Sequence, residues 1–171
     1  MEHCDVIDYS IREKKTLLEC GEGNGSRTFT PLSNNQPFQI ANVTIDASKL
    51  CHPIVNIEFS SAVKFEIASE MGVSGIVRLR YELFSSCDGR EPLSLGVWLF
   101  QKLTTLSVGG TRSETTSFGF DFCECLTCCS RCIEYFVLVN PIQVEATSPS
   151  GANEVKATTS NGRMAALVQE K

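Results

Sequence analysis

Residues 93–99 read LSLGVWL, and apolar side chains recur at every second position through Leu93, Leu95, Val97 and Leu99. In an extended chain successive side chains point to opposite faces, so these four would share one face. Trp98 lies among them and is expected in the core. The same alternation recurs in IVNIEFSS (54–61), VRLRYEL (77–83) and FGFDF (118–122). Alternation over about four to eight residues is typical of a strand with one buried face.

Turn-forming residues separate these runs, and they gather in SEMGVSG (69–75), CDGREP (87–92), VGGTRSE (108–114) and SPSGANE (148–154). We expect further strands at 37–46, 133–146, 153–160 and 163–169. In IEYFVLV (133–139) both faces are apolar, which predicts a central strand covered on both sides. The pattern therefore predicts an all-β fold, a single β-sandwich of jelly-roll type with about 8–9 strands.

The first 26 residues differ from the rest, because they are polar and end in CGEGNGS (20–26). A short amphipathic helix over residues 7–19 and an extended arm both fit this composition. We expect residues 1–26 to form a flexible connector arm, with residues 27–171 as the sandwich. The hinge of this arm is predicted at Gly21, Gly23 and Gly25. A phosphate-binding turn is not expected here, because no strand is predicted before the glycines and no helix after them.

Composition excludes several function classes. The net charge is −5 and the chain carries no basic stripe, so a nucleic-acid partner is not expected. No stretch approaches the roughly 18 consecutive apolar residues of a membrane-spanning helix, so no membrane partner is expected. The start, MEHCDVIDYSIREKK, lacks the apolar core of a secretory signal, which predicts synthesis in the cytoplasm. Without a catalytic motif, we expect no enzyme and no cofactor.

The chain has nine cysteines, and five of them fall within FCECLTCCSRCIEYF (122–136). A zinc site is one interpretation, because two C-x-x-C pairs can supply four thiolates, although zinc knuckles are usually about a dozen residues apart. Redox chemistry is a second, but a catalytic C-x-x-C usually accompanies a βαβ pattern. Disulfides are the third. His3 and His52 are expected to be surface histidines.

Disulfides to other subunits fit the pattern best. Cys123 and Cys125 lie two apart on a predicted strand, on the face opposite the phenylalanines, so both are expected to be exposed. An odd number of cysteines leaves at least one thiol free or bonded to another molecule. We expect intermolecular bonds from Cys4, Cys20, Cys123, Cys125, Cys128, Cys129 and Cys132. Intramolecular bonds are expected from Cys51 and Cys87. The alternative zinc ligands are Cys125, Cys128, Cys129 and Cys132.

Five segments carry a resemblance over about residues 20–169: CGEGNG, PFQIANVTIDASKLCHPIVNIEFSSAVKF, CDGREPLSLGVWLF, TSFGFDFCECLTCCSRCIEYFVLV and SNGRMAALVQ. They resemble a family of short proteins from clostridial spore formers, described as a domain of unknown function. Its most specific element is the F-C-E-C-x-x-C block. The plan is also similar to that of endospore-appendage subunits, which are small jelly rolls whose cysteine-bearing N-terminal connectors bond to neighbouring subunits.

Pattern and resemblance together predict a structural protein. We expect a self-assembling subunit of an extracellular fibre, on an endospore appendage or spore surface, joined by strand addition and by disulfides through the arm. The chain is then its own main partner, and spore-surface anchoring proteins are a further candidate. The alternative is a zinc-binding spore coat or surface protein that forms no filaments.

Overall fold

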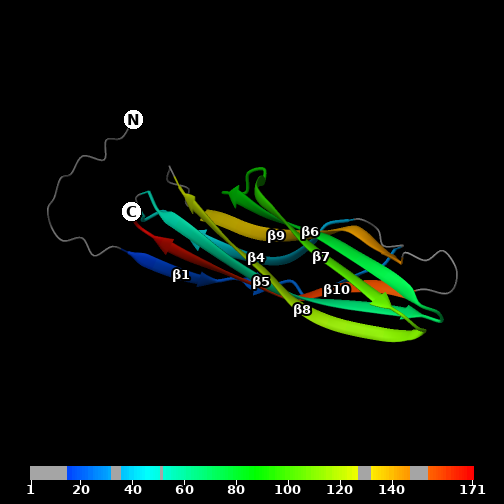
Figure 1. Cartoon of the computed structure of the whole chain (residues 1–171). Coiled ribbons are helices and arrows are strands. Elements are labelled where there is room, and N and C mark those ends of the chain that lie inside the picture. The colour runs from blue at the N-terminus through cyan, green and yellow to red at the C-terminus, as the bar shows by residue number, and fades with distance from the viewer. Residues whose placement is uncertain (1–14, 32–35, 51, 127–131, 147–153) are drawn as a thin grey trace, which may run out of the picture.

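The computed structural model describes residues 15–31, 36–50, 52–126, 132–146 and 154–171. They form ten β-strands in two antiparallel sheets that pack face to face as one elongated sandwich (Figure 1). Cys4, Cys51, Cys128 and Cys129 lie outside the described residues, so the predictions made for them are not tested. Within the described ranges there is no helix long and apolar enough to cross a membrane.

Sheet A contains β1 (Thr16–Cys20), β10 (Glu154–Gln169), β5 (Ile54–Ser69) and β8 (Gly110–Cys125) in that order, with β3 (Arg27–Phe29) also paired to β10. Sheet B contains β2 (Glu22–Gly23), β4 (Phe38–Asp46), β9 (Cys132–Ala146), β6 (Val73–Cys87) and β7 (Leu93–Leu106). Of the paired strands, β6 and β7 alone are consecutive, and the other described connections switch sheets. This connectivity is that of a jelly roll, so the predicted fold class is confirmed.

The core lies between the inner faces of the two sheets, as the alternation predicts. In β5, Val55, Ile57 and Phe59 are at most 2% exposed, while the residues between them face solvent. Tyr81 of β6 is completely buried, and its hydroxyl lies 3.0 Å from the hydroxyl of Thr159 in β10, which links the two sheets. Strand β9 lies between β4 and β6, so its central position is confirmed. Its outer face is not covered as expected, because Phe136 and Leu138 on that face are only half-buried.

Two local predictions differ from the structure. Residues 153–160 and 163–169 were expected as separate strands, but they form one strand, β10, with a register shift between Ser160 and Arg163. Asn161 takes up the extra length there with a φ of +53°, in the left-handed region that asparagine tolerates. In β7, moreover, Leu95 packs against the core as predicted and so does Trp98, but Leu93, Val97 and Leu99 of the predicted apolar series are exposed.

Candidate functional site: open sheet edges and exposed thiols

Strands β7 and β8 lie on one side of the sandwich, and each is the last strand of its sheet. Each pairs on one edge alone, β7 with β6 and β8 with β5, among the residues that the structure describes. Figure 1 shows the two strands running from the turn that joins them at one end of the sandwich. Both therefore carry a row of backbone N–H and C=O groups without a strand partner, which is the usual template for pairing with another chain.

The rings of four aromatic residues hold these two edge strands together. Trp98 of β7 stacks on Phe120 of β8, with ring centroids 3.8 Å apart and planes 5° from parallel. Phe100 and Phe118 meet edge to face at 6.0 Å. At the far end of the pair, Lys102 lies 2.6 Å from Glu114, and its hydrogen bond lowers the pKa of that carboxyl below its usual value. The two edges are thus held as a unit.

The outer face of β7 is unusually apolar for a surface strand. Four side chains stand in solvent: Leu93, Val97, Leu99 and Leu103 are 65%, 46%, 65% and 62% exposed. The core role that the alternation suggested for Leu93, Val97 and Leu99 is therefore wrong. A register shift opposite Leu83 and Phe84 in β6 changes the phase of the alternation, and Trp98 takes the inward position. An exposed apolar patch of this kind often marks an interaction surface.

On the other side of the sandwich, the segment from β1 to β3 passes from sheet A to sheet B and back, and we call this segment the crossing. The chain pairs with β10 as β1, passes to sheet B as β2, and returns to β10 as β3. The Gly21 N–H donates to the Met164 carbonyl at 2.7 Å, and the Asn24 N–H donates to the Ile40 carbonyl at 2.9 Å. Residues 16–23, which were assigned to the connector arm, thus contribute strands to both sheets of the body.

The glycines predicted as a hinge occupy different environments. A Cβ atom at Gly21 would overlap the Asn42 carbonyl oxygen, and one at Gly23 would overlap the Gly162 carbonyl oxygen. These two glycines therefore allow close packing of backbone on backbone. Gly25 has open space around it and a φ of +88°, which is a turn conformation. A strand does precede these glycines, contrary to expectation, but strand β3 follows them, so a phosphate-binding turn is still not formed.

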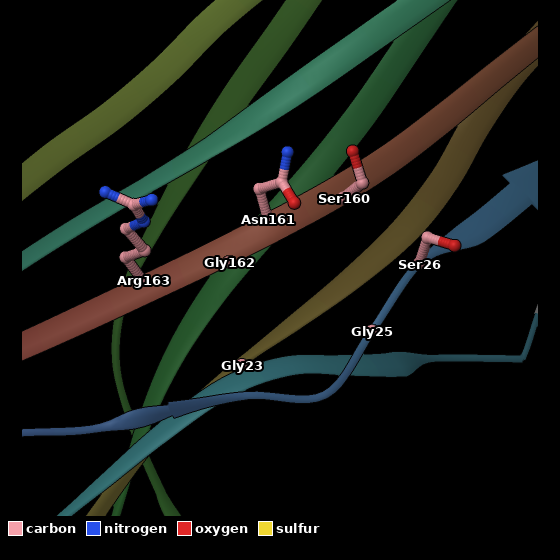
Figure 2. Close-up of a pocket in the computed structure, with 7 residues that line it drawn as sticks. All are labelled: Gly23, Gly25, Ser26, Ser160, Asn161, Gly162 and Arg163. Carbon is pink, nitrogen blue, oxygen red and sulfur yellow. The ribbon is translucent and has the colours of Figure 1, made fainter.

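A shallow hollow of about 490 Å³ lies beside this crossing, as Figure 2 shows. Its described lining consists of glycines, two serines and two longer side chains from the irregular part of β10, Asn161 and Arg163. Arg163 is the single charged residue of that lining. No pair of titratable groups faces another across the hollow in the described part of the chain, so it offers no acid–base chemistry.

The described thiols do not form one cluster. Cys123 and Cys125 are exposed on the outer face of sheet A, at its β8 edge, as their spacing predicts. Cys20 is exposed on β1, at the opposite edge of that sheet. Cys132 is exposed at the start of β9 in sheet B, whereas Cys87 is half-buried against the core. All five are free thiols in the structure.

The zinc interpretation gains no support from the described residues, among which no group of three or more cysteine, histidine or acidic side chains could hold a metal ion. Of the four proposed ligands, Cys128 and Cys129 lie outside the described residues. Cys125 and Cys132 flank that segment at the ends of β8 and β9.

A further link between the sheets, which the sequence did not predict, lies at the end where β8 finishes. The hydroxyl of the completely buried Tyr135 in β9 donates to the Glu124 carboxylate of β8 at 2.5 Å. Burial raises the pKa of Tyr135 strongly, and the hydrogen bond to Glu124 adds to that shift. No pattern in the sequence pairs these two residues, because each partner lies on a different sheet.

Residues 14–168 match the sequence model of a family described as a domain of unknown function (DUF4489). A search of curated protein sequences gave no match. Among solved structures, a chain of infectious bursal disease virus Gt strain is similar at 9% identity and a TM-score of 0.38. The match covers 94% of this chain and 38% of the viral chain, so this chain spans well under half of that protein. Eiger TNF from S. frugiperda is similar at 9% identity and a TM-score of 0.37, covering 91% and 93%.

Proposed function

We propose that this chain, which belongs to the family described as a domain of unknown function (DUF4489), is a structural subunit that assembles with copies of itself into an extracellular fibre. Its role is architectural and not catalytic. Subunits join by strand addition at the sheet edges, and disulfides through exposed thiols then make the assembly covalent.

The observation that carries this proposal is the β7 edge. This strand has 14 residues and no partner on its outer side in the described structure, and its exposed face is lined by three leucines and a valine. Monomeric sandwiches usually protect such an edge with charges, proline or a covering loop. Here Lys102 is the one charged residue in the strand, and it is paired with Glu114. Covering this edge would remove apolar side chains from water and satisfy backbone groups together.

A second copy of the chain is the occupant we propose. The open β7 and β8 edges lie on one side of the sandwich, and the β1 and β2 edges lie on the other. A contact between two different sides of the same protein is heterologous, so repeating it extends a row of subunits. A row that does not close into a ring is a fibre.

For the place of assembly we rely on the family resemblance and on the exposed thiols, and we propose the spore surface. Five described cysteines are free, and the four exposed ones can be reached by another subunit. We propose that the fibre reaches the spore surface when the mother cell lyses and that oxidation then fixes it. Anchoring proteins of the spore surface are proposed as further partners.

The test replaces the exposed leucines of β7 by lysine. The double variant Leu99→Lys/Leu103→Lys should leave folding intact, since both side chains are more than half exposed. The matched control is Met71→Lys, which changes an apolar residue that is 58% exposed in the turn between β5 and β6. Particle size is followed by light scattering and electron microscopy in the presence of reductant, so that cross-links do not contribute.

We expect the wild type and the Met71→Lys control to form large assemblies, and the double variant to remain near the monomer mass of 18.8 kDa. Unchanged assembly of the double variant would show that β7 is not the contact. A wild-type protein that stays monomeric with and without reductant would overturn the proposed function itself.

A further inference from the structure

Cys20 and Cys123 lie on the same outer face of sheet A, at its two opposite edges. Across the sheet, Cys20 is opposite Ala165, Ala165 opposite Glu58, and Glu58 opposite Asp121. Directly opposed residues share a face, and Cys123 is two positions beyond Asp121, so it shares that face as well. Both thiols are exposed.

These thiols cannot bond to each other within one subunit. Two strands, β10 and β5, lie between β1 and β8. At the usual strand spacing the axes of β1 and β8 are therefore about 14 Å apart. A disulfide needs Cα atoms within about 7 Å. Cys123 and Cys125 are also unsuited as a pair, because side chains two apart on a strand point the same way and their Cβ atoms stay beyond the roughly 4.5 Å that a disulfide allows.

Strand directions permit a bond between subunits. Neighbouring strands in sheet A are all antiparallel, so across the order β1, β10, β5 and β8 the first and last strands run in opposite directions. A second copy placed beside the first in the same orientation therefore brings its β8 antiparallel to β1. Sheet B alternates in the same way from β4 to β7, so that β7 of this second copy runs antiparallel to β4.

The register selects one cysteine. If the second copy is not shifted along the strand direction, Cys20 of the first copy lies opposite Asp121 of the second. A shift of the second copy by two residues leaves Cys20 on the same face of the sheet and places it opposite Cys123. Leu18, which is 63% exposed, then lies opposite Cys125, the last residue of β8, so that Leu18–Cys20 pair with β8 while Thr16 and Leu17 extend past its end. A stagger of four residues would move all of β1 except Cys20 past the end of β8. Opposed residues in antiparallel strands have Cα atoms about 4.5–5.5 Å apart, which suits a disulfide.

We propose that β1 of one subunit pairs antiparallel with β8 of the next, and that a disulfide between Cys20 and Cys123 locks this contact. This inference rests on the proposed self-assembly and names its contact. Two thiols lose two protons and two electrons as the S–S bond forms. Molecular oxygen is the oxidant, and it accepts both protons and both electrons to leave as hydrogen peroxide.

Disulfide mapping on the full chain tests the pairing. Equal amounts of unlabelled and ¹⁵N-labelled protein are mixed while reduced, oxidised in air and digested with trypsin without reductant. Cleavage gives peptide 16–27, whose one cysteine is Cys20, and peptide 113–131, which contains Cys123, Cys125, Cys128 and Cys129. We expect these two peptides to be linked, with half of the linked pairs joining a labelled to an unlabelled peptide.

Two matched variants identify the cysteine within the second peptide. In Cys125→Ser the linked pair should persist, and in Cys123→Ser it should be lost, although both serines stand on the same exposed face of β8. A link that survives Cys123→Ser, or one that joins peptides of a single isotope only, would overturn the pairing. Light scattering in reductant separates this result from the proposed function. Large assemblies without the Cys20–Cys123 link would refute the pairing alone, whereas an absence of assemblies would refute both.

Discussion

Replacing Gly21 by alanine distinguishes a packed crossing from a free hinge. Gly21 lies where the chain leaves β1 for β2, and its N–H donates to the Met164 carbonyl at 2.7 Å. An added Cβ would overlap the carbonyl oxygen of Asn42 and would lie 2.8 Å from Val43 Cβ. In a flexible hinge the same substitution would meet no neighbour and would leave the stability of the sandwich unchanged.

The expected loss of stability follows from these contacts. The new Cβ would lie 2.8 Å from Val43 Cβ, which is 0.6 Å closer than the 3.4 Å at which ordinary contact begins (3.4 minus 2.8). The overlap with Asn42 involves backbone, which cannot move away as a flexible side chain can. Overpacking of this kind costs about 1–3 kcal/mol, and the smaller entropy of the unfolded alanine chain offsets about 0.4–1 kcal/mol. A net loss of about 1.5 kcal/mol lowers the melting temperature by roughly 3–6 °C in a domain of this size.

The assay is thermal unfolding by circular dichroism in reductant, on protein kept dilute enough to remain monomeric. The control is Asn24→Ala, because this exposed residue uses its backbone N–H for the contact with Ile40 and keeps that contact as alanine. We expect the control to melt within about 1 °C of the wild type, since surface substitutions usually change stability by less than about 0.5 kcal/mol. If Gly21→Ala melts with the control, the packed crossing is refuted and the hinge restored.

Substitutions at three further positions probe the core and the irregular part of β10. Burial raises the pKa of both Tyr81 and Tyr135 above 10.0, so above that pH the unfolded chain releases protons that the fold retains. Stability should then fall by up to about 1.4 kcal/mol per pH unit for each tyrosine, and Tyr135→Phe should show a shallower fall in urea midpoint between about pH 10 and 11; equal slopes would contradict this. Phe120→Ala should lower the free energy of unfolding, measured in urea, by about 3–5 kcal/mol. It should also shift the native fluorescence of Trp98 to longer wavelength, because the indole loses its stacked ring. An unshifted spectrum would argue against the stack. Asn161→Ala should cost about 1–2 kcal/mol because of its positive φ, while Asn161→Gly stays near the wild type, and equal values for the two would refute the role of backbone strain.

The fold was predictable because its signal is local. In IVNIEFSS and FGFDF the apolar residues repeat at the period of a strand, and they are the residues that pack inward. The exposure of Cys123 followed from the same period, since its position relative to Phe122 fixes its face. Such inferences need no knowledge of the partner strand, because a single extended segment determines which side chains share a face.

The faces of β7 and the role of the glycines were not predictable in this way. β7 is an edge strand with apolar residues in both phases of its alternation, and the register shift opposite Leu83 and Phe84 changes which phase faces inward. Gly21 and Gly23 look like a flexible linker in sequence. Their neighbours, Asn42 and Gly162, come from distant parts of the chain. Glycine is found both where backbones pack closely and where the chain is flexible, so its presence in a sequence does not distinguish the two.

The same aromatic rings that stabilise the monomer leave its edges available. The rings of Trp98 and Phe120 stack between β7 and β8, which pair with β6 and β5 and not with each other among the described residues. The sandwich therefore cannot close into a barrel at this side, and closure alone would remove the edges. Neither strand contains a proline. A reversible edge contact can thus find its register while the thiols are reduced, and oxidation then makes that register permanent.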